Sequence, residues 1–209
     1  MSQLPPITES FKKIQAWAST QAPDISFREP VDPAAILNFS QKSGLSLPED
    51  LRKILCLADG ERRNSAGMIG NWRLMSIAEI QAAWGLLKAL AEKGAFLGQE
   101  AEAPVYIRNA WWDGAWIPFV TSDGGDYFCL DMNPPEPTRV GQVVLFLRDQ
   151  PERPLIAGSL SAWFDHIARD LESGLYAYDE ENGFNGEAFM WSALQKKHLF
   201  DGIQGKLIT

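Results

Sequence analysis

The chain has 209 residues, 45% hydrophobic and 22% charged, with a formal net charge of −8 at pH 7 and a pI near 4.8. This ordinary globular composition excludes a disordered or fibrous protein. The acidic balance disfavours general phosphate binding, because affinity for nucleic acid comes largely from clustered Lys and Arg.

The N-terminal segment predicts a short helix followed by a loop. Phe11, Ile14 and Trp17 recur at helical spacing, and the helix ends before Pro23. We expect Trp17 to pack on the main domain. Residues 21–31 show no clear period, which indicates a linking loop.

Two further helices carry start and stop signals. Asp32 can accept hydrogen bonds from exposed amides at the start of the first helix, and Gly44 can end it in a left-handed turn. The second helix begins at residues 47–50 and is closed by Gly60. The predicted buried positions of the two helices are Ile36, Leu37, Phe39, Leu51, Ile54, Leu55 and Ala58.

A polar loop at 61–71 precedes a short predicted strand at 72–75. Ser76 and Glu79 form a capping box at the start of a helix that stops near Gly94. The apolar stripe of this helix consists of Ile77, Ile80, Trp84, Leu87 and Ala91.

The second half of the chain predicts strands and then one long helix. The strands are expected at 105–108, 115–120, 127–132 and 143–147, and their short loops indicate antiparallel neighbours. Ser159 caps a helix that ends at Gly174, with Leu160, Trp163, Phe164, Ile167 and Leu171 on its apolar face. This order predicts an α+β fold with helices packed on a mainly antiparallel or mixed sheet.

Few residues suggest chemistry. Cys56 and Cys129 form no Cys-x-x-Cys pair, so we expect two core thiols without a zinc site or disulfide. Asp123, Asp126 and Asp131 invite a metal or acid–base interpretation, but their spacing does not match a calcium loop. The favoured interpretation is a tight turn in which glycines adopt positive φ and Asp side chains bond turn amides. We expect no catalytic residue, cofactor or metal.

The chain also lacks signals for membranes. Met1–Thr20 has no basic region followed by an apolar run, and no stretch approaches the roughly 18 apolar residues of a membrane span. We therefore expect a cytoplasmic protein.

Trp111, Trp112 and Trp116 cluster before the most distinctive part of the sequence. Aromatic residues of this kind serve either a core or a binding surface. Core packing is the favoured reading, with one of them open to a partner.

The stretch from Trp116 to Arg148 resembles the central signature of the SMI1/KNR4 family, also called the SUKH superfamily. The similarity covers roughly 34–182, with weaker support from Gly70-Asn71-Trp72 and Leu74-Met75-Ser76. The signature residues, to which we assign a structural role, are Trp116, Ile117, Pro118, Asp123, Gly124, Gly125, Asp126, Asp131 and Gly141. The resemblance implies an α+β domain over 32–182. Residues 1–31 then form a helix and linking loop, and 183–209 a C-terminal extension packed on the domain.

The resemblance also implies an intracellular binding module and not an enzyme. Relatives include bacterial immunity proteins and a fungal hub that regulates cell-wall synthesis. We predict first an immunity protein that blocks a cognate toxin, for example a basic nuclease, and as the alternative a regulatory scaffold binding endogenous proteins. An enzyme using the three Asp residues is a third possibility. The predicted partner-binding residues are Trp111, Trp112, Asp113, Glu136, Asp179, Glu180 and Glu181.

Overall fold

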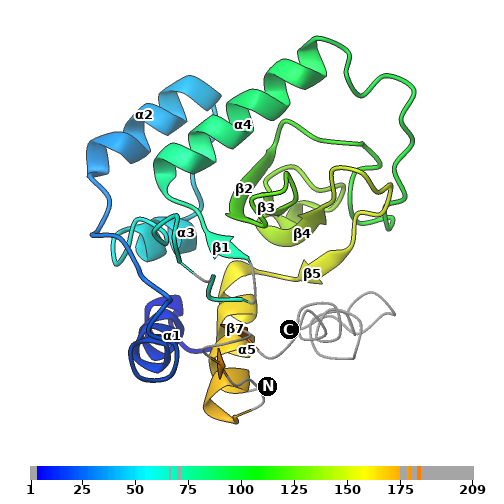
Figure 1. Ribbon diagram of the computed structural model, residues 1–209. Coiled ribbons are helices and arrows are strands. Elements are labelled where there is room, and N and C mark those ends of the chain that lie inside the picture. The colour runs from blue at the N-terminus through cyan, green and yellow to red at the C-terminus, as the bar shows by residue number, and fades with distance from the viewer. Residues whose placement is uncertain (1–3, 66, 70–71, 175–177, 180–182, 185–209) are drawn as a thin grey trace.

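The computed structural model describes residues 4–65, 67–69, 72–174, 178–179 and 183–184. Within these ranges, the protein has five α-helices and a five-stranded sheet (Figure 1). Two of the helices pack on the sheet, and the other three pack mainly on helices. The helices are α1 (Ile7–Gln21), α2 (Pro33–Ser43), α3 (Glu49–Leu55), α4 (Ile77–Glu92) and α5 (Leu160–Glu172). The strands of the sheet are β1 (Arg73–Leu74), β2 (Trp116–Thr121), β3 (Tyr127–Asp131), β4 (Gln142–Phe146) and β5 (Leu155–Ala157). The predicted α+β fold is confirmed.

The sheet is an antiparallel meander in which strands follow one another in sequence order from β1 to β5. Short connections favour this order because successive antiparallel strands need little chain to reverse direction. The pairing of β2 with β3 shifts register between Pro118 and Val120, where proline cannot donate a ladder hydrogen bond. A short 3-10 turn, η1 (Pro137–Arg139), precedes β4, and β6 (Tyr178–Asp179) pairs with β7 (Gly183–Phe184) in a separate hairpin.

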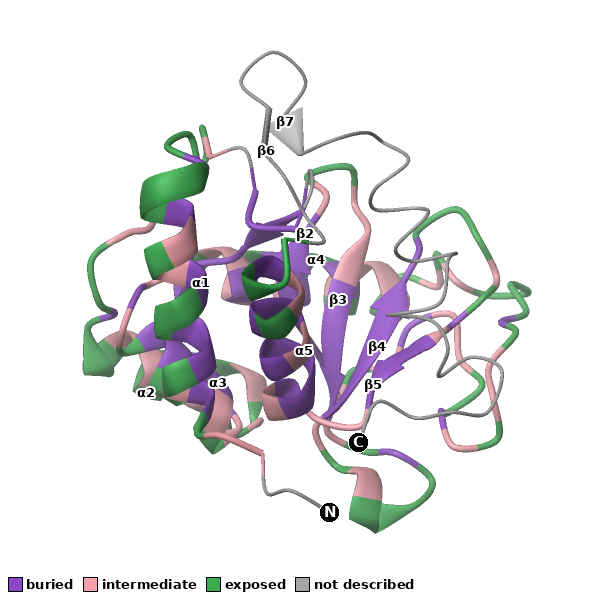
Figure 2. Ribbon diagram, turned by 90° about the horizontal axis from the view of Figure 1, so that it is seen from below, coloured by how far each residue is buried: buried purple, intermediate pink, exposed green. Residues whose placement is uncertain are grey.

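Helices α4 and α5 lie on opposite sides of the sheet (Figure 1). The strands β2 and β4 are buried at every position, and Figure 2 shows most of the sheet coloured as buried. The indole of Trp163 on α5 lies 5.4 Å from the ring of Phe119 and 5.3 Å from that of Phe128, measured between centroids. Such aromatic packing removes large apolar areas from water and fixes α5 on the sheet.

Helix α1 shares this core. The ring of Phe11 meets Phe164 of α5 at a centroid distance of 5.8 Å, and Trp17 is partly buried against the core as predicted. The domain boundaries at residues 32 and 182 stay predictions. The predicted packing of the C-terminal extension falls on residues 185–209, which lie outside the described part of the chain.

The predicted helix starts are confirmed. The Asp32 carboxylate accepts a hydrogen bond of 2.9 Å from the Ala34 amide, and Ser159 accepts one of 3.1 Å from the Ala162 amide. Ser76 and Glu79 form the complete capping box. These side chains satisfy amides that a helix start leaves without an intrahelical partner.

Several local expectations are wrong, and one strand was missed. The helix that Gly60 was expected to close ends at Leu55 as α3, with Cys56 as its C-cap. Residues 105–108 form turns and no strand, because Pro104 accepts the Ile107 amide in a turn while Val105 is 90% exposed. The strand β5 was missed because it contains only three residues between Pro154 and Gly158. Leu37 is exposed since α2 packs mainly on α4 and buries Phe39. Cys56 is also exposed, at the end of α3, whereas Cys129 is buried as predicted.

The chain requires glycine at position 60. Gly60 has φ +71°, and a β-carbon there would lie 2.5 Å from the Met75 carbonyl carbon and the Ser76 nitrogen. We expect Gly60→Ala to lower the free energy of unfolding by about 3 kcal/mol or more, since backbone must move as well as adopt a strained φ. Gly44→Ala is the matched control, because Gly44 has φ +73° with open space around it. That control should lose about 1–2 kcal/mol. Urea denaturation of both variants checks the difference, and equal losses would contradict the close approach.

Candidate functional site

A groove of about 240 Å³ lies between α4, the β2–β3 turn and the segment after Gly60. Ala82, Ala83 and Leu86 of α4 supply an apolar wall, and Leu86 is 58% exposed. Asp123 and Tyr127 line the opposite side. An exposed leucine beside charged groups gives this surface both apolar area and fixed polar contacts, as in protein interfaces.

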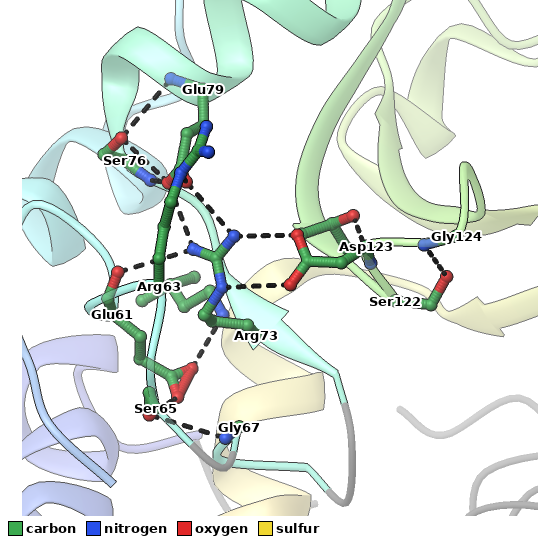
Figure 3. Close-up of polar contacts among 12 residues, drawn as sticks. Glu61, Arg63, Ser65, Gly67, Arg73, Ser76, Glu79, Ser122, Asp123 and Gly124 are labelled. Atoms are coloured by element: carbon green, nitrogen blue, oxygen red, sulfur yellow. Dashed lines mark hydrogen bonds and ion pairs between the residues drawn. The ribbon is translucent and has the colours of Figure 1, made fainter.

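Arg73 holds the charged end of the groove together. This buried side chain comes from β1, and its Nη2 lies 2.9 Å from Oδ1 of Asp123 while its Nε donates to Oδ2 (Figure 3). Its Nη1 donates to Oε2 of Glu79 at 3.1 Å and to the Glu61 carbonyl at 3.4 Å. One guanidinium thereby connects β1, the β2–β3 turn, α4 and the loop after Gly60, because its donors form a rigid planar fork.

The Glu79 carboxylate is shared between helix capping and this ion pair. Its Oε2 accepts hydrogen bonds of 2.9 Å from both the Ser76 amide and the Ser76 hydroxyl. Its Oε1 lies 3.4 Å from Nε of Arg63, an exposed side chain at the rim. Burial alone raises the pKa of Glu79, but hydrogen bonds from Arg73 and Ser76 outweigh burial and lower it. Burial likewise lowers the pKa of Arg73, whereas its bonds to Asp123 and Glu79 raise it overall.

Glu61 is fully buried beneath this network. Its carboxylate accepts hydrogen bonds from the Leu74 amide at 2.7 Å, the Met68 amide at 3.3 Å and the Ser65 hydroxyl at 3.0 Å. Burial raises its pKa to about 7 despite these three donors. The sequence analysis missed Glu61, because it stands in a polar loop and its partners lie 4, 7 and 13 residues away. Its position directly after Gly60 was the only local signal.

The signature acids point in different directions. Asp126 accepts from the Arg148 amide at 2.8 Å, while buried Asp131 accepts from the Asn133 amide and from Nε2 of Gln142. Together with Asp123 at Arg73, they occupy three separate places. Among the described residues, no group of three or more His, Cys, Asp or Glu is placed to hold a metal ion.

The β2–β3 turn differs in detail from the prediction. The turn amides of Asp123 and Gly124 donate to the hydroxyls of Thr121 and Ser122, and not to Asp side chains. Positive φ occurs at Gly125, as predicted, and also at Asp123, with φ 59°. Asp123 tolerates this conformation because short polar residues enter the left-handed region more readily than bulky ones. In this conformation the Asp123 carboxylate forms its ion pair with Arg73.

The remaining signature residues lie in or beside the sheet. Trp116, Ile117 and Pro118 belong to the buried strand β2, and Gly141 precedes β4 with φ +88°. Their structural role stays a prediction.

The predicted partner residues are spread over several environments. Trp112 is buried, and Trp111 is partly buried with the Arg153 guanidinium 4.8 Å from its ring centroid. Asp113 lines a hollow of about 640 Å³ together with Pro135, next to exposed Glu136. Asp179 lies in β6, and Glu180 and Glu181 fall outside the described residues.

Buried Arg153 fixes the loop that carries this tryptophan cluster. Its guanidinium donates to the carbonyls of Trp111, Gln150 and Glu152, at distances from 2.7 to 2.9 Å. Burial lowers the pKa of Arg153 to about 10. These hydrogen bonds from the charged guanidinium to backbone carbonyl oxygens therefore hold the loop against the sheet.

A sequence model of the SMI1 / KNR4 family (SUKH-1) matches residues 30–166, which include the groove, the capping box and the β2–β3 turn. The chain belongs to the SMI1/KNR4 family. The matched range ends within α5, so the family region covers all five strands of the sheet.

Named SMI1/KNR4 relatives are fungal. The chain is 27% identical over 194 residues to the cell wall biosynthesis/cell cycle regulator smi1 of Schizosaccharomyces pombe, covering 85% of this chain and 38% of that protein. It is 25% identical to a glucan synthesis regulatory protein of Neurospora crassa, with 84% and 40% covered. It is 20% identical to the cell wall assembly regulator SMI1 of Saccharomyces cerevisiae, with 85% and 43% covered. The match thus spans about two fifths of the length of these relatives.

None of the helices in the described ranges is long and apolar enough to span a membrane.

Removal of the Arg73 guanidinium should destabilise the folded protein. Arg73→Leu leaves the half-buried Glu79 carboxylate without its main cation, so we expect the free energy of unfolding to decrease by about 3 kcal/mol, the low end of the cost of breaking a buried pair. The matched control is Arg148→Gln, because Arg148 pairs with Asp149 on the open surface, where an ion pair contributes about 0–1 kcal/mol. Guanidinium chloride denaturation measures the loss of stability in each of the two variants. A loss below 1 kcal/mol for Arg73→Leu would contradict the central role of this side chain.

Glu61 should make stability depend on pH. Its pKa in the folded protein, about 7, lies above the ordinary value of 4.5, so its contribution to folding is full below pH 4.5 and decreases as the pH rises through 7. The wild-type protein should therefore lose of the order of 2–3 kcal/mol relative to Glu61→Gln between pH 5 and pH 8. Denaturation of both proteins at a series of pH values tests this slope, whatever the absolute cost of the substitution. Parallel pH profiles would contradict it.

Proposed function

We propose that the protein is a non-catalytic module that binds other proteins and acts in regulation, in the manner of its fungal relatives. The observation that carries this proposal is the similarity to the cell-wall and glucan-synthesis regulators, which covers 84–85% of this chain. The chain aligns with about two fifths of each relative, so it corresponds to one module of those longer proteins.

The groove beside α4 supports a binding role. Its charged groups are already paired with one another, as Arg73 is with Glu79 and Asp123, and so form a rigid polar end. Leu86 and the exposed Arg63 remain at its rim. A preorganised polar end beside exposed apolar area lowers the entropic cost of association and sets the orientation of a partner. We propose that the partner is a protein and that the module works in the cytoplasm.

A second candidate is an immunity protein that occludes a cognate toxin. The net charge of −8 favours it, because an acidic surface would be steered toward the basic cleft of a nuclease. The named relatives favour the regulatory role, which therefore stands first.

Affinity purification from the native cell, followed by mass spectrometry, separates the two roles. We expect a set of endogenous proteins, whereas one stoichiometric nuclease or other toxin would favour the immunity role. Leu86→Glu should weaken capture of the main partner by about tenfold or more, since it places a charge on the apolar wall. Leu97→Glu, at a leucine 84% exposed outside the groove, is the control. Equal capture by both variants would exclude the groove as the binding surface.

A further inference from the structure

A third hollow, of about 550 Å³, lies among α1, α2 and α3. Its apolar surface comes from Pro33 and Ile36 of α2 and from Cys56 and Leu57 at the end of α3. Arg52 and Lys53 border it, and long basic side chains cover apolar surface with their aliphatic stems. We call this hollow the α1–α3 groove.

The groove exists because α2 is only lightly packed. Phe39 is the buried residue of this 11-residue helix, and its packing is directed at α4. Ile36 therefore remains half-buried on the side that faces the groove, and Leu57 is half-buried across from it. Covering this apolar surface is favourable in proportion to its area. The free groove thus retains apolar surface that a partner can bury.

The charge at the rim selects the kind of partner. Lys53 is paired with Glu49 at 2.8 Å and Asp50 at 3.8 Å, whereas the side chain of Arg52 is exposed and makes no ion pair with a described residue. Arg52 and Lys53 against Glu49 leave one positive charge on the lining of a chain whose net charge is −8. Thr8 of α1 and Pro33 of α2 also line the groove, and they add no charge to it.

From these observations we infer that the α1–α3 groove docks an amphipathic helix of a partner protein, with acidic side chains beside its apolar stripe. The apolar stripe lies between Ile36 and Leu57, and an acidic side chain pairs with Arg52. This is the helix-in-groove mode of recognition, in which apolar anchors supply affinity and flanking charges supply selectivity. The inference rests on the proposed role as a protein-binding module, and it assigns one partner class to a surface separate from the groove beside α4.

Cys56 provides a reporter inside the groove. It is exposed, whereas Cys129 is buried, so a thiol-reactive, environment-sensitive fluorophore labels Cys56 selectively. The probe is a synthetic peptide of about 15 residues, with leucines at helical spacing and glutamates on both flanks. A second peptide has lysines in place of the glutamates. Titration of the labelled full chain should give a saturable signal with the glutamate peptide and affinity about tenfold weaker with the lysine peptide.

Two variants locate the contact. Ile36→Glu should weaken binding of the glutamate peptide by about tenfold or more, because it places a negative charge on the apolar wall beside the negative charges of the peptide. Arg52→Glu, at an exposed position that does not endanger folding, should reverse the preference in favour of the lysine peptide. Leu97→Glu should bind like the wild type, because its new charge lies outside the groove. Circular dichroism confirms that each variant is folded.

Four outcomes would overturn the inference. They are no saturable signal, equal affinity for both peptides, an Arg52→Glu variant that keeps the original preference, and a wild-type dimer that Ile36→Glu dissociates in sedimentation. The last outcome assigns the groove to a second copy of the chain. If the peptides fail while Leu86→Glu still abolishes capture of a cellular partner, the inference is wrong but the proposed function stands.

Discussion

The burial of the Arg73 guanidinium is the constraint on which the candidate site depends. Two carboxylates and a backbone carbonyl surround this charge, and they come from α4, the β2–β3 turn and the loop after Gly60. A buried ion pair adds little stability compared with a well-packed apolar alternative, but it penalises any arrangement in which a partner is missing. Arg73 therefore specifies how these elements meet. Its position on the two-residue strand β1 also explains why so short a strand is held in place.

Glu61 extends this constraint into the loop that follows Gly60. Its carboxylate binds the amide of Leu74, next to Arg73, while its own carbonyl accepts from Arg73 and Arg28. The loop is thus attached to β1 through both the side chain and the backbone of one residue. Burial brings the pKa of Glu61 to about 7, so this contact is the point at which we expect pH to act on the loop.

The two grooves differ in how they are built. The groove beside α4 has charges that are paired within the protein, which favours a fixed shape and an oriented partner. The α1–α3 groove has apolar walls and, at its rim, the cation Arg52, which makes no ion pair within the described part of the chain. This combination favours an apolar segment of opposite charge. A regulatory module that contacts more than one partner can use such different surfaces. Both lie on the helices that pack around one aromatic core, in which Trp163 joins α5 to the sheet.

The sequence by itself determined the features that depend on neighbouring residues. Capping at Asp32, Ser76 and Ser159, the apolar stripe of α5 and the strands β2–β4 all follow from local hydrogen bonding and periodicity. The α+β class followed from the same patterns, whereas the family resemblance came from the signature between Trp116 and Arg148. The local signals failed at 105–108, where a turn replaces a strand, because alternation over four residues is weak beside the preference of Pro104 for a turn.

Only the tertiary structure decided where the polar side chains meet and which apolar ones stay exposed. Arg73 and Asp123 are 50 residues apart, and no periodicity relates them. Leu37 and Cys56 look like core residues in sequence, yet they are exposed because no element among the described residues covers those faces of α2 and α3. Trp112 was named as a partner-binding residue although core packing was the favoured interpretation of its cluster, and the structure buries it. Burial is set by the packing of distant elements, so neither residue type nor spacing fixes it in advance.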